Sequence, residues 1–317
     1  MRPEPSEPCR RLLALQSGVI ARWQAPAVGL GTNAVEAQLR NGRWRPLCRG
    51  VYATFTGDPA RLALLWAAVL GAGPRAILSH ETAAELDGLL DRPATMIHIT
   101  VPDAQRVRVD PGVTVHRSRR IEQARHPGLA PPRTMIEETV LDLAQAASTF
   151  DDAFSWASRA CQRELTTPVL LRMRMDMRSA MRWRGELGAA LQAVWDGAHS
   201  ILEYRYLRDV ERAHGLPQAR RQVRASQRGS TVYRDVLYEK YRVAIELDGQ
   251  ASHPAEQRWR DIDRDNVAAA AGIVTLRYTW IDVTRRPCAV ASEVSAVLQR
   301  RGWRGEPHPC RNGCPLP

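Results

Sequence analysis

Three carboxylates at the end of a predicted hairpin have the types and spacing that can do chemistry. Glu246 and Asp248 are two residues apart in YRVAIELDG, and Asp235 lies in the preceding run, TVYRDVLY. Side chains two apart in a strand point to the same face, so Glu246 and Asp248 lie side by side with Asp235 on the adjacent strand. Glu203, on the helix predicted before the hairpin, is a fourth acid that can join them.

These acids predict a site for a hard divalent cation, because without one they would repel each other. Magnesium or manganese takes carboxylate oxygens and keeps several waters. A bound ion can activate water and neutralise charge that develops on a scissile phosphate. We predict that the ligands are Asp235, Glu246, Glu203 and Asp248, with His253 beside them as an acid or base near neutral pH. The alternative is a solvated hairpin with surface acids.

The elements that must position these residues extend over residues 198–300. An amphipathic helix, SILEYRYLRDVERAHGL, ends at Gly215 and is followed by three strand-like runs: RRQVRASQ, TVYRDVLY and YRVAIELDG. A helical turn, a strand IVTLRYTW and a last helix complete the order. In the third strand, alternation points Val243, Ile245 and Leu247 to one face and the acids to the other.

Five blocks in this region carry a resemblance to a known family: RRQV, YRDV, IELDGQASH, DIDRDN and AAGIVTLRYTWIDV. In this order and spacing they resemble the very-short-patch repair (Vsr)-like endonuclease domain, a branch of the PD-(D/E)XK restriction-endonuclease-like superfamily. The resemblance implies a magnesium-dependent DNA endonuclease with a mixed sheet flanked by helices. It makes Asp235 and Glu246 the metal-binding acids and Glu203 the acid of the leading helix. It also makes His253 the base and Arg264 a phosphate clamp.

The third motif position of that superfamily is usually lysine, and here it is Asp248. A lysine there would polarise the attacking water or the scissile phosphate, whereas an aspartate can only add a metal ligand. Lys240, the single lysine of the chain, lies in the predicted hairpin turn. A degenerate nuclease domain that binds DNA without cutting it is therefore the second interpretation.

Residues 10–56 predict a winged helix-turn-helix. A short helix is expected to begin at Leu12 and a second to extend from Gly18 to Ala27. A third helix, NAVEAQLRNG, and a two-stranded wing, RWRPLCRGVYATF, follow. The second helix of a helix-turn-helix enters the major groove, so this module favours DNA binding over a protein-interaction role. The candidate DNA contacts are Thr32, Asn33, Gln38, Arg40, Arg43, Arg45 and Arg49.

Residues 57–150 predict a mixed α/β middle domain. It contains a buried helix, ARLALLWAAVL, and the strand-like runs MIHITVP and VTVHRS. GRWRPLCRGVYA, SHETAAELDGL and IHITVP resemble AbiEi-type antitoxins of type IV toxin–antitoxin systems. That resemblance implies a transcriptional repressor with a cognate toxin as partner. The histidines here, His80, His98 and His116, are scattered and are interpreted as packed or solvated.

Residues 151–197 predict a helical, arginine-rich connector, in which Met173, Met177 and Met181 share a helical face and are expected in the core. The last segment, 301–317, is rich in proline and contains His308, Cys310 and Cys314. Three local ligands fall short of the four that a structural zinc site needs. We therefore expect a flexible tail there rather than a metal site.

Composition sets the limits of these interpretations. The chain has 317 residues, a net charge of +11 and 44% hydrophobic residues, which predicts a multidomain α/β (α+β) protein with a polyanion partner. No apolar run approaches the ~20 residues that span a bilayer, and the N-terminus lacks a signal-peptide layout. Dispersed cysteines without a CxxC motif fit a reducing compartment, so a cytoplasmic protein with no membrane contact is expected.

Overall fold

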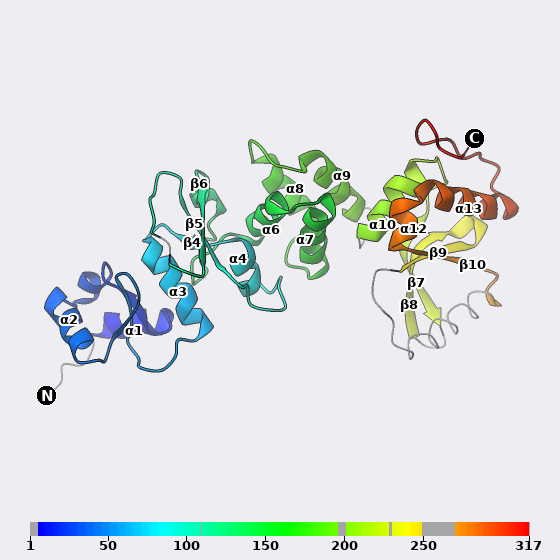
Figure 1. Ribbon diagram of the computed structural model, residues 1–317. Coiled ribbons are helices and arrows are strands. Elements are labelled where there is room, and N and C mark those ends of the chain that lie inside the picture. The colour runs from blue at the N-terminus through cyan, green and yellow to red at the C-terminus, as the bar shows by residue number, and fades with distance from the viewer. Residues whose placement is uncertain (1–5, 109, 196–200, 228–229, 249–269, 317) are drawn as a thin grey trace. The chain divides into compact units, whose positions relative to one another are not determined.

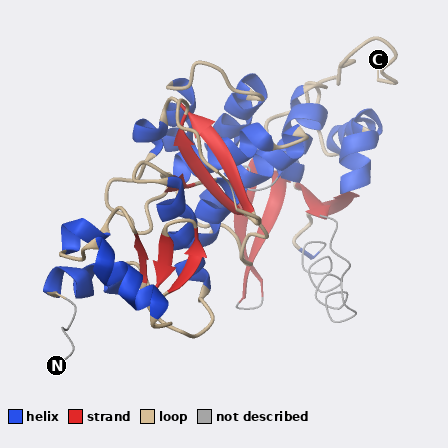
Figure 2. Cartoon of the chain, turned by 60° about the vertical axis from the view of Figure 1, so that its left-hand side comes forward, coloured by secondary structure: helices blue, strands red, loops and turns tan. Residues whose placement is uncertain are grey.

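The computed structural model describes residues 6–108, 110–195, 201–227, 230–248 and 270–316. The chain divides into two compact units, one of residues up to 148 with 159–182, the other of residues 149–158 with those from 183 onward. Both mix helices with small sheets (Figures 1 and 2). None of the described helices is both long and apolar enough to cross a membrane.

The first unit begins with a small module of helices around a three-stranded antiparallel sheet. Its sheet order is β1-β3-β2, and Gly50, with φ +73°, turns the β2–β3 hairpin that the sequence predicts. Ile20, Val35 and Tyr52 form its buried core. The elements are α1 (Glu7–Leu15), β1 (Val19–Ala21), η1 (Ala25–Val28), α2 (Thr32–Arg40), β2 (Arg45–Cys48) and β3 (Val51–Ala53).

The prediction of a helix from Gly18 to Ala27 is wrong. Strand β1 and the short 3₁₀ turn η1 occupy this segment. Gly18 has φ +75°, which ends the preceding turn, and the β-branched Val19 and Ile20 that follow are completely buried. Burial between neighbouring strands and helices therefore outweighs the local helical pattern.

The rest of the first unit is built on a second three-stranded sheet, ordered β4-β5-β6, with β5 and β6 parallel. Helix α3 is apolar on nearly all sides, as predicted. Its Trp66 and Leu70 pack in the core of the first sheet, while its Leu65 and Val69 pack in the core of the second. The elements are α3 (Arg61–Ala72), β4 (Ile77–Leu78), α4 (His80–Leu86), β5 (Ile97–Pro102), β6 (Val113–Ser118), α5 (Ile121–Ala124), α6 (Ile136–Ala146) and α8 (Pro168–Asp176).

The prediction of a buried methionine stripe is also wrong. Met173 and Met177 are 59% and 58% exposed, whereas Leu171 and Met175 are completely buried. Helix α8 ends at Asp176, so the stripe runs past the end of the helix. The inward-facing row is instead the pair at 171 and 175, one helical turn apart.

The second unit has a four-stranded mixed sheet, ordered β10-β9-β8-β7, in which only β9 and β10 are parallel. Val236 and Ile245 of the sheet pack with Tyr206, Val294 and Leu298 of the helices. The elements are α7 (Phe150–Gln162), whose last residues belong to the first unit, α9 (Arg184–Trp195), α10 (Ile201–Arg205), η2 (Tyr206–Arg212), β7 (Arg220–Gln227), β8 (Ser230–Tyr238), η3 (Glu239–Tyr241), β9 (Val243–Asp248), β10 (Val274–Thr279), α12 (Trp280–Arg285) and α13 (Pro287–Arg300).

Helix α10 continues directly into the π-helical segment η2, and this continuous helix and the turn after it carry residues of both sites described below. The N–H of Leu216 donates to the carbonyl of Glu211 at 3.0 Å, five residues back. The helix ends at Arg212, and Gly215, with φ +65°, lies in the turn that follows. Glu203 thus lies near the start of the helix and His214 in the turn after its end.

The C-terminal segment after α13 lies against this helix. The N–H of His308 donates to the carbonyl of His214 at 3.1 Å. Leu316 is 7% exposed and belongs to the hydrophobic core of the second unit, against which Trp303 also packs. The segment predicted as a flexible tail therefore makes both polar and apolar contacts with the unit.

Candidate functional site

Gln222 joins two of the predicted acids. Its Nε2 donates to Oε1 of Glu203 at 2.9 Å and to Oδ1 of Asp235 at 3.1 Å. Glu203 is only 4% exposed, so one carboxylate of the pair is buried. Residues of α10, β7 and β8 thereby meet at one point.

Asp235 also binds the strand that carries the other two acids. Its Oδ2 accepts a hydrogen bond of 2.8 Å from the N–H of Leu247, which lies between Glu246 and Asp248. The β8–β9 ladder pairs Val236 with Ile245, and the next position of the same register places Asp235 opposite Glu246. The structure therefore brings Glu203, Asp235 and Glu246 to the same end of the sheet.

Gln222 is a residue that the sequence interpretation missed. Its φ of +46° lies in the left-handed region, which is rare for a residue other than glycine. Its neighbours Arg221 and Val223 keep their register with Val236 and Arg234, so the distortion is confined to this residue. Such outliers collect at functional sites. Pairing RRQV against YRDV in an antiparallel register would have placed Gln222 opposite Asp235.

A basic residue lies beside the acids on the neighbouring strand. The parallel register of β9 and β10 pairs Arg277 with Glu246 and Thr279 with Asp248. Glu246 is half-buried, while Ala244 on the same face is completely buried. The predicted alternation holds on the opposite face, where Val243 and Ile245 lie in the core.

Some of the predicted site residues lie beyond what the structure describes. His253 and Arg264 are outside the described residues, and so is the side chain of Asp248, although its backbone ends β9. Their roles as base, phosphate clamp and fourth ligand therefore stay predictions.

The tightest group of metal-ligand atoms among the described residues is a different one. One ligand atom from each of His214, Cys288, Cys310 and Cys314 lies within 4.8 Å of all the others. This group can hold a metal ion, and its sulfur-rich donors suit zinc rather than magnesium. The sequence interpretation considered only the ligands of the tail itself, whereas the structure adds His214 and Cys288 from distant parts of the chain to Cys310 and Cys314.

The candidate DNA contacts gather around helix α2 and the β2–β3 hairpin. Thr32, Asn33, Arg40, Arg43 and Arg49 are exposed, and Gln38 is half-buried. The buried Val35 fixes the inner face of α2. This arrangement leaves the start of the helix and the basic residues near the hairpin open to a partner.

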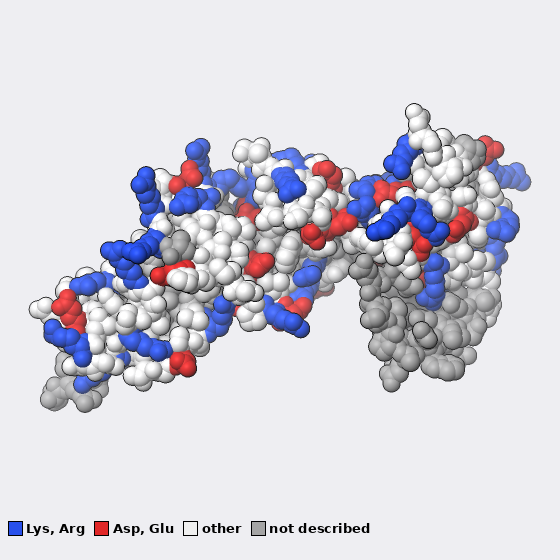
Figure 3. Space-filling model, viewed as in Figure 1, with Lys and Arg blue, Asp and Glu red and all other residues white. Residues whose placement is uncertain are grey.

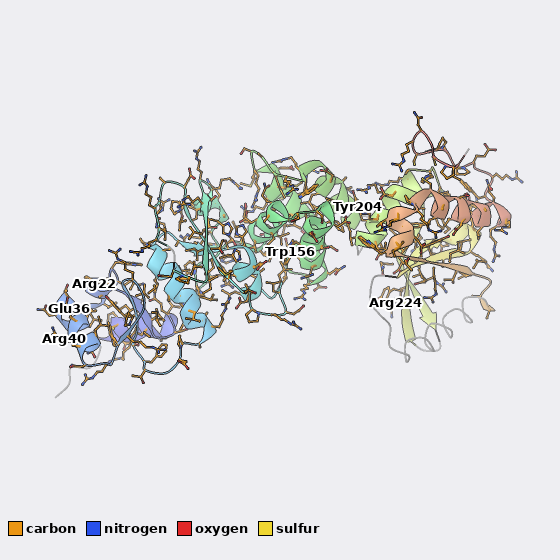
Figure 4. The ribbon with its side chains drawn as sticks, viewed as in Figure 1. Arg22, Glu36, Arg40, Trp156, Tyr204 and Arg224 are labelled. Carbon is orange, nitrogen blue, oxygen red and sulfur yellow. The ribbon has the colours of Figure 1, made fainter. Side chains whose placement is uncertain are left out.

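Two features correct this candidate set. Arg45 donates through Nη2 to the carbonyl of Gly57, and its Nε is buried, so its side chain is held within the fold. Arg22, which the sequence interpretation did not include, forms an ion pair of 3.2 Å with Glu36 on α2 (Figure 4). On the face shown in Figure 3, basic side chains are spread over the surface with acidic ones between them.

The histidines interpreted as scattered are in fact brought together in the first unit. The rings of His80 and His116 stack with centroids 3.6 Å apart, and Nδ1 of His98 is 3.0 Å from Nε2 of His116. Burial lowers the pKa of His80 to about 3 and that of His116 to about 4. These rings are therefore neutral near pH 7, and His80 and His116 line a pocket of about 330 Å³ with Arg120 and Arg178.

No protein-family model matches this chain, and no curated protein matches its sequence. The resemblance of the sequence blocks to endonucleases and antitoxins therefore stays an expectation. The function is inferred from the residues and contacts described above.

Proposed function

We propose that the chain is a DNA-binding protein whose second unit is a magnesium-dependent endonuclease that hydrolyses phosphodiester bonds. The observation that carries this proposal is the Gln222 bridge between Glu203 and Asp235, with Asp235 bonded to the strand of Glu246 and Asp248. Acids from three separate elements converge at one end of the sheet, where a solvated hairpin would need no such link.

The donor chemistry of this site fits magnesium. Because one nitrogen of Gln222 contacts both Glu203 and Asp235, their two oxygens are no farther apart than the sum of those two hydrogen bonds. Like charges at this separation raise the free energy of the ionised pair, and a divalent cation offsets it. We assign the metal ligands to Asp235, Glu246, Glu203 and Asp248, with manganese as the alternative ion. An ion held there supplies an activated water and neutralises charge on the phosphate.

Four further residues have roles around the metal ligands in this proposal. Gln222 orients two ligands with one amide, and the N–H of Leu247 orients Asp235 from the other side. His253 is assigned as the group that moves a proton, and Arg264 as the phosphate clamp.

The module of α1 to β3 is proposed as the DNA-binding part. A helix followed by a two-stranded hairpin, with a third strand completing the sheet, supports a winged helix-turn-helix. The exposed Arg40, Arg43 and Arg49 are suited to phosphate contacts, and Thr32 and Asn33 at the start of α2 to base contacts. Arg45 is left out of the proposed contacts because the fold already uses its guanidinium.

Metal-dependent cleavage tests the nuclease. The full chain is incubated with supercoiled, linear, mismatched and single-stranded DNA in magnesium, manganese or chelator. We expect nicking only with metal, and a loss of at least about 100-fold in Glu246→Gln, since even residues that only support a metal ligand are worth 10–100-fold. Glu239→Gln, at an exposed acid in η3, is the matched control and should cleave normally. Equal cleavage by both variants would contradict the assignment.

The alternative function is a repressor of a toxin–antitoxin system, with a cognate toxin as partner and a nuclease domain that does not cut. The aspartate at position 248, where the superfamily usually has lysine, favours it. This function predicts sequence-specific DNA binding that survives chelation. Arg40→Ala and Arg43→Ala should each lower the salt slope of binding by about 0.9, while Arg75→Ala, distant from the hairpin in sequence and paired with Glu122, should not. Unchanged salt slopes in both Arg40→Ala and Arg43→Ala would contradict this function.

A further inference from the structure

We infer that His214, Cys288, Cys310 and Cys314 form a structural zinc site that fastens the C-terminal segment to the second unit. All four ligand atoms lie within 4.8 Å of one another. Three thiolates and one imidazole are a common ligand set of structural zinc. The site is independent of the proposed nuclease, since none of its ligands belongs to the acidic site.

The distances within the cluster fit a tetrahedral ion. Zinc–sulfur bonds of about 2.3 Å place two sulfur ligands of a tetrahedron about 3.8 Å apart. Sγ of Cys288 and Sγ of Cys310 are 3.6 Å apart. A disulfide would need about 2.05 Å, so these two sulfurs are separate and spaced as zinc ligands.

His214 is oriented as a metal ligand. Its ring is completely buried, and its Nδ1 lies 3.0 Å from the carbonyl oxygen of Val210, one helical turn earlier. Donation from Nδ1–H leaves the lone pair on Nε2, the tautomer that metal-bound histidines generally adopt. Among the described residues, Nε2 is a buried atom with no hydrogen-bond partner. Such an atom is costly unless something binds it, and the three sulfurs beside it point to a metal ion.

Three separate segments supply the ligands. His214 lies in the turn that follows η2, two residues after the helix ends, and Cys288 is the second residue of α13. Cys310 and Cys314 flank a turn in which the N–H of Cys314 donates to the carbonyl of Arg311 at 3.1 Å and Gly313 has φ +82°. The hydrogen bond from His308 to His214 already aligns the last segment with the helix. A metal ion would cross-link all three segments.

The site is structural because it is closed. Four protein ligands fill a tetrahedron and leave no position for water or substrate, unlike a catalytic zinc site. The free energy of binding zinc then adds to the stability of the second unit, because the unfolded chain does not hold these ligands together.

Metal content is the first test. Full-length protein purified under reducing conditions is reconstituted with zinc, dialysed and measured by plasma mass spectrometry. We expect about one zinc per chain, and less than about a tenth of that in Cys288→Ser, Cys314→Ser and His214→Asn. Cys161→Ser and His308→Ala are matched controls that should keep the metal, because neither residue is among the four candidate ligands. Equal loss in ligand and control variants would overturn the proposal.

Cobalt substitution tests the geometry without any variant, in case the ligand variants do not fold. Cobalt(II) bound by three thiolates in a tetrahedron gives intense visible bands and a thiolate charge-transfer band. We expect both bands, and we expect one equivalent of zinc to displace the cobalt and abolish them. Zinc added to the apoprotein should raise the melting temperature by about 10 °C. No such bands in the reduced wild-type protein, or a disulfide between Cys288 and Cys310 as its stable state, would overturn the proposal.

Discussion

The acidic site and the proposed zinc site lie in the same unit but are assembled in opposite ways. The acids offer hard oxygen ligands, and a glutamine and a backbone N–H hold two of them in place. The zinc ligands are soft, and four of them converge within 4.8 Å. A magnesium ion bound by carboxylates keeps several waters, whereas four protein ligands fill the coordination sphere of zinc.

One continuous helix and the turn after it carry a member of each site, Glu203 near the start of the helix and His214 in the turn. The two sites should therefore respond differently to mutation. A change at one end should alter catalysis without stability, and a change at the other should alter stability without catalysis. The predictions below test this separation.

The largest expected effect is the response to a brief exposure to a chelator. Millimolar EDTA applied briefly should lower cleavage at least about 100-fold, with recovery on adding magnesium, because carboxylate-bound magnesium exchanges readily. Zinc content should stay near one per chain and the melting temperature should change by less than about 2 °C. Cleavage, zinc content and melting temperature falling together would show that the two sites are not separate.

Gln222→Ala should lower cleavage by about 10–100-fold, because residues that orient metal ligands have effects of this size. The apparent magnesium affinity should fall as well, while zinc content stays unchanged. Gln218→Ala, at an exposed glutamine before the same strand, is the control. A normal magnesium dependence in Gln222→Ala would show that the bridge to Glu203 and Asp235 does not position them.

A smaller effect is expected at the zinc end of the helix from Gly215→Ala. A Cβ there would lie 2.6 Å from Cδ2 of His308, and φ is +65°. We expect a destabilisation of about 1–2 kcal/mol, a melting temperature about 3–6 °C lower, and faster release of zinc to a chromogenic chelator. Cleavage should not change.

Gly302→Ala is the matched control, since Gly302 also has a positive φ, +96°, but nothing lies within 4 Å of the added Cβ. It should reproduce the strain without the faster zinc release. The same release rate in both variants would argue against contact with the tail as the cause.

The smallest expected effect concerns the histidine cluster of the first unit. This unit contains neither proposed metal site, so it tests whether stability also depends on groups away from those sites. Burial lowers the pKa of His116 to about 4, below the 6.5 that is usual for a histidine. His80 and His98 contact its ring, Glu81 lies 3.8 Å from His98, and the charge of Arg178 acts on His80. Between pH 6.5 and pH 4, His116 binds a proton in the unfolded state but not in the folded state. The neutral buried ring therefore contributes to the free energy of unfolding above pH 6.5, and this contribution is lost as the pH falls towards 4.

His116→Gln should therefore lose less stability than the wild type between pH 7 and 4.5, by about 2–4 °C in melting temperature. Both proteins have the same zinc ligands, so the difference between them isolates the first unit. Parallel curves would show that the burial of His116 does not affect folding at acid pH.

Much of the acidic site could be predicted from the sequence, because its ligands follow short-range rules. Alternation in a strand places Glu246 and Asp248 opposite the buried Val243 and Ile245, and the hairpin brings Asp235 beside them. Gln222 could not be predicted from alternation alone, because its role depends on the register of β7 against β8 and on a left-handed backbone.

Local pattern failed where tertiary burial was decisive. Residues 18–27 have helical spacing, yet Val19 and Ile20 are buried as part of β1. Met173 and Met177 share a helical period, but both are exposed, and helix α8 ends at Asp176, between the two. In both segments, the sequence pattern describes one element and says nothing about which neighbour will cover it.

By itself, the sequence determined the order of the four strands in the second unit and the face of the hairpin that carries acids, because both depend on residues close together in the chain. Only the tertiary structure decided that His214 and Cys288 would meet Cys310 and Cys314. No spacing rule relates these residues, since they converge through the packing of a helix end, a helix start and a terminal segment around one core. Long-range convergence depends on how all the elements pack, and that information is not present in any single stretch of sequence.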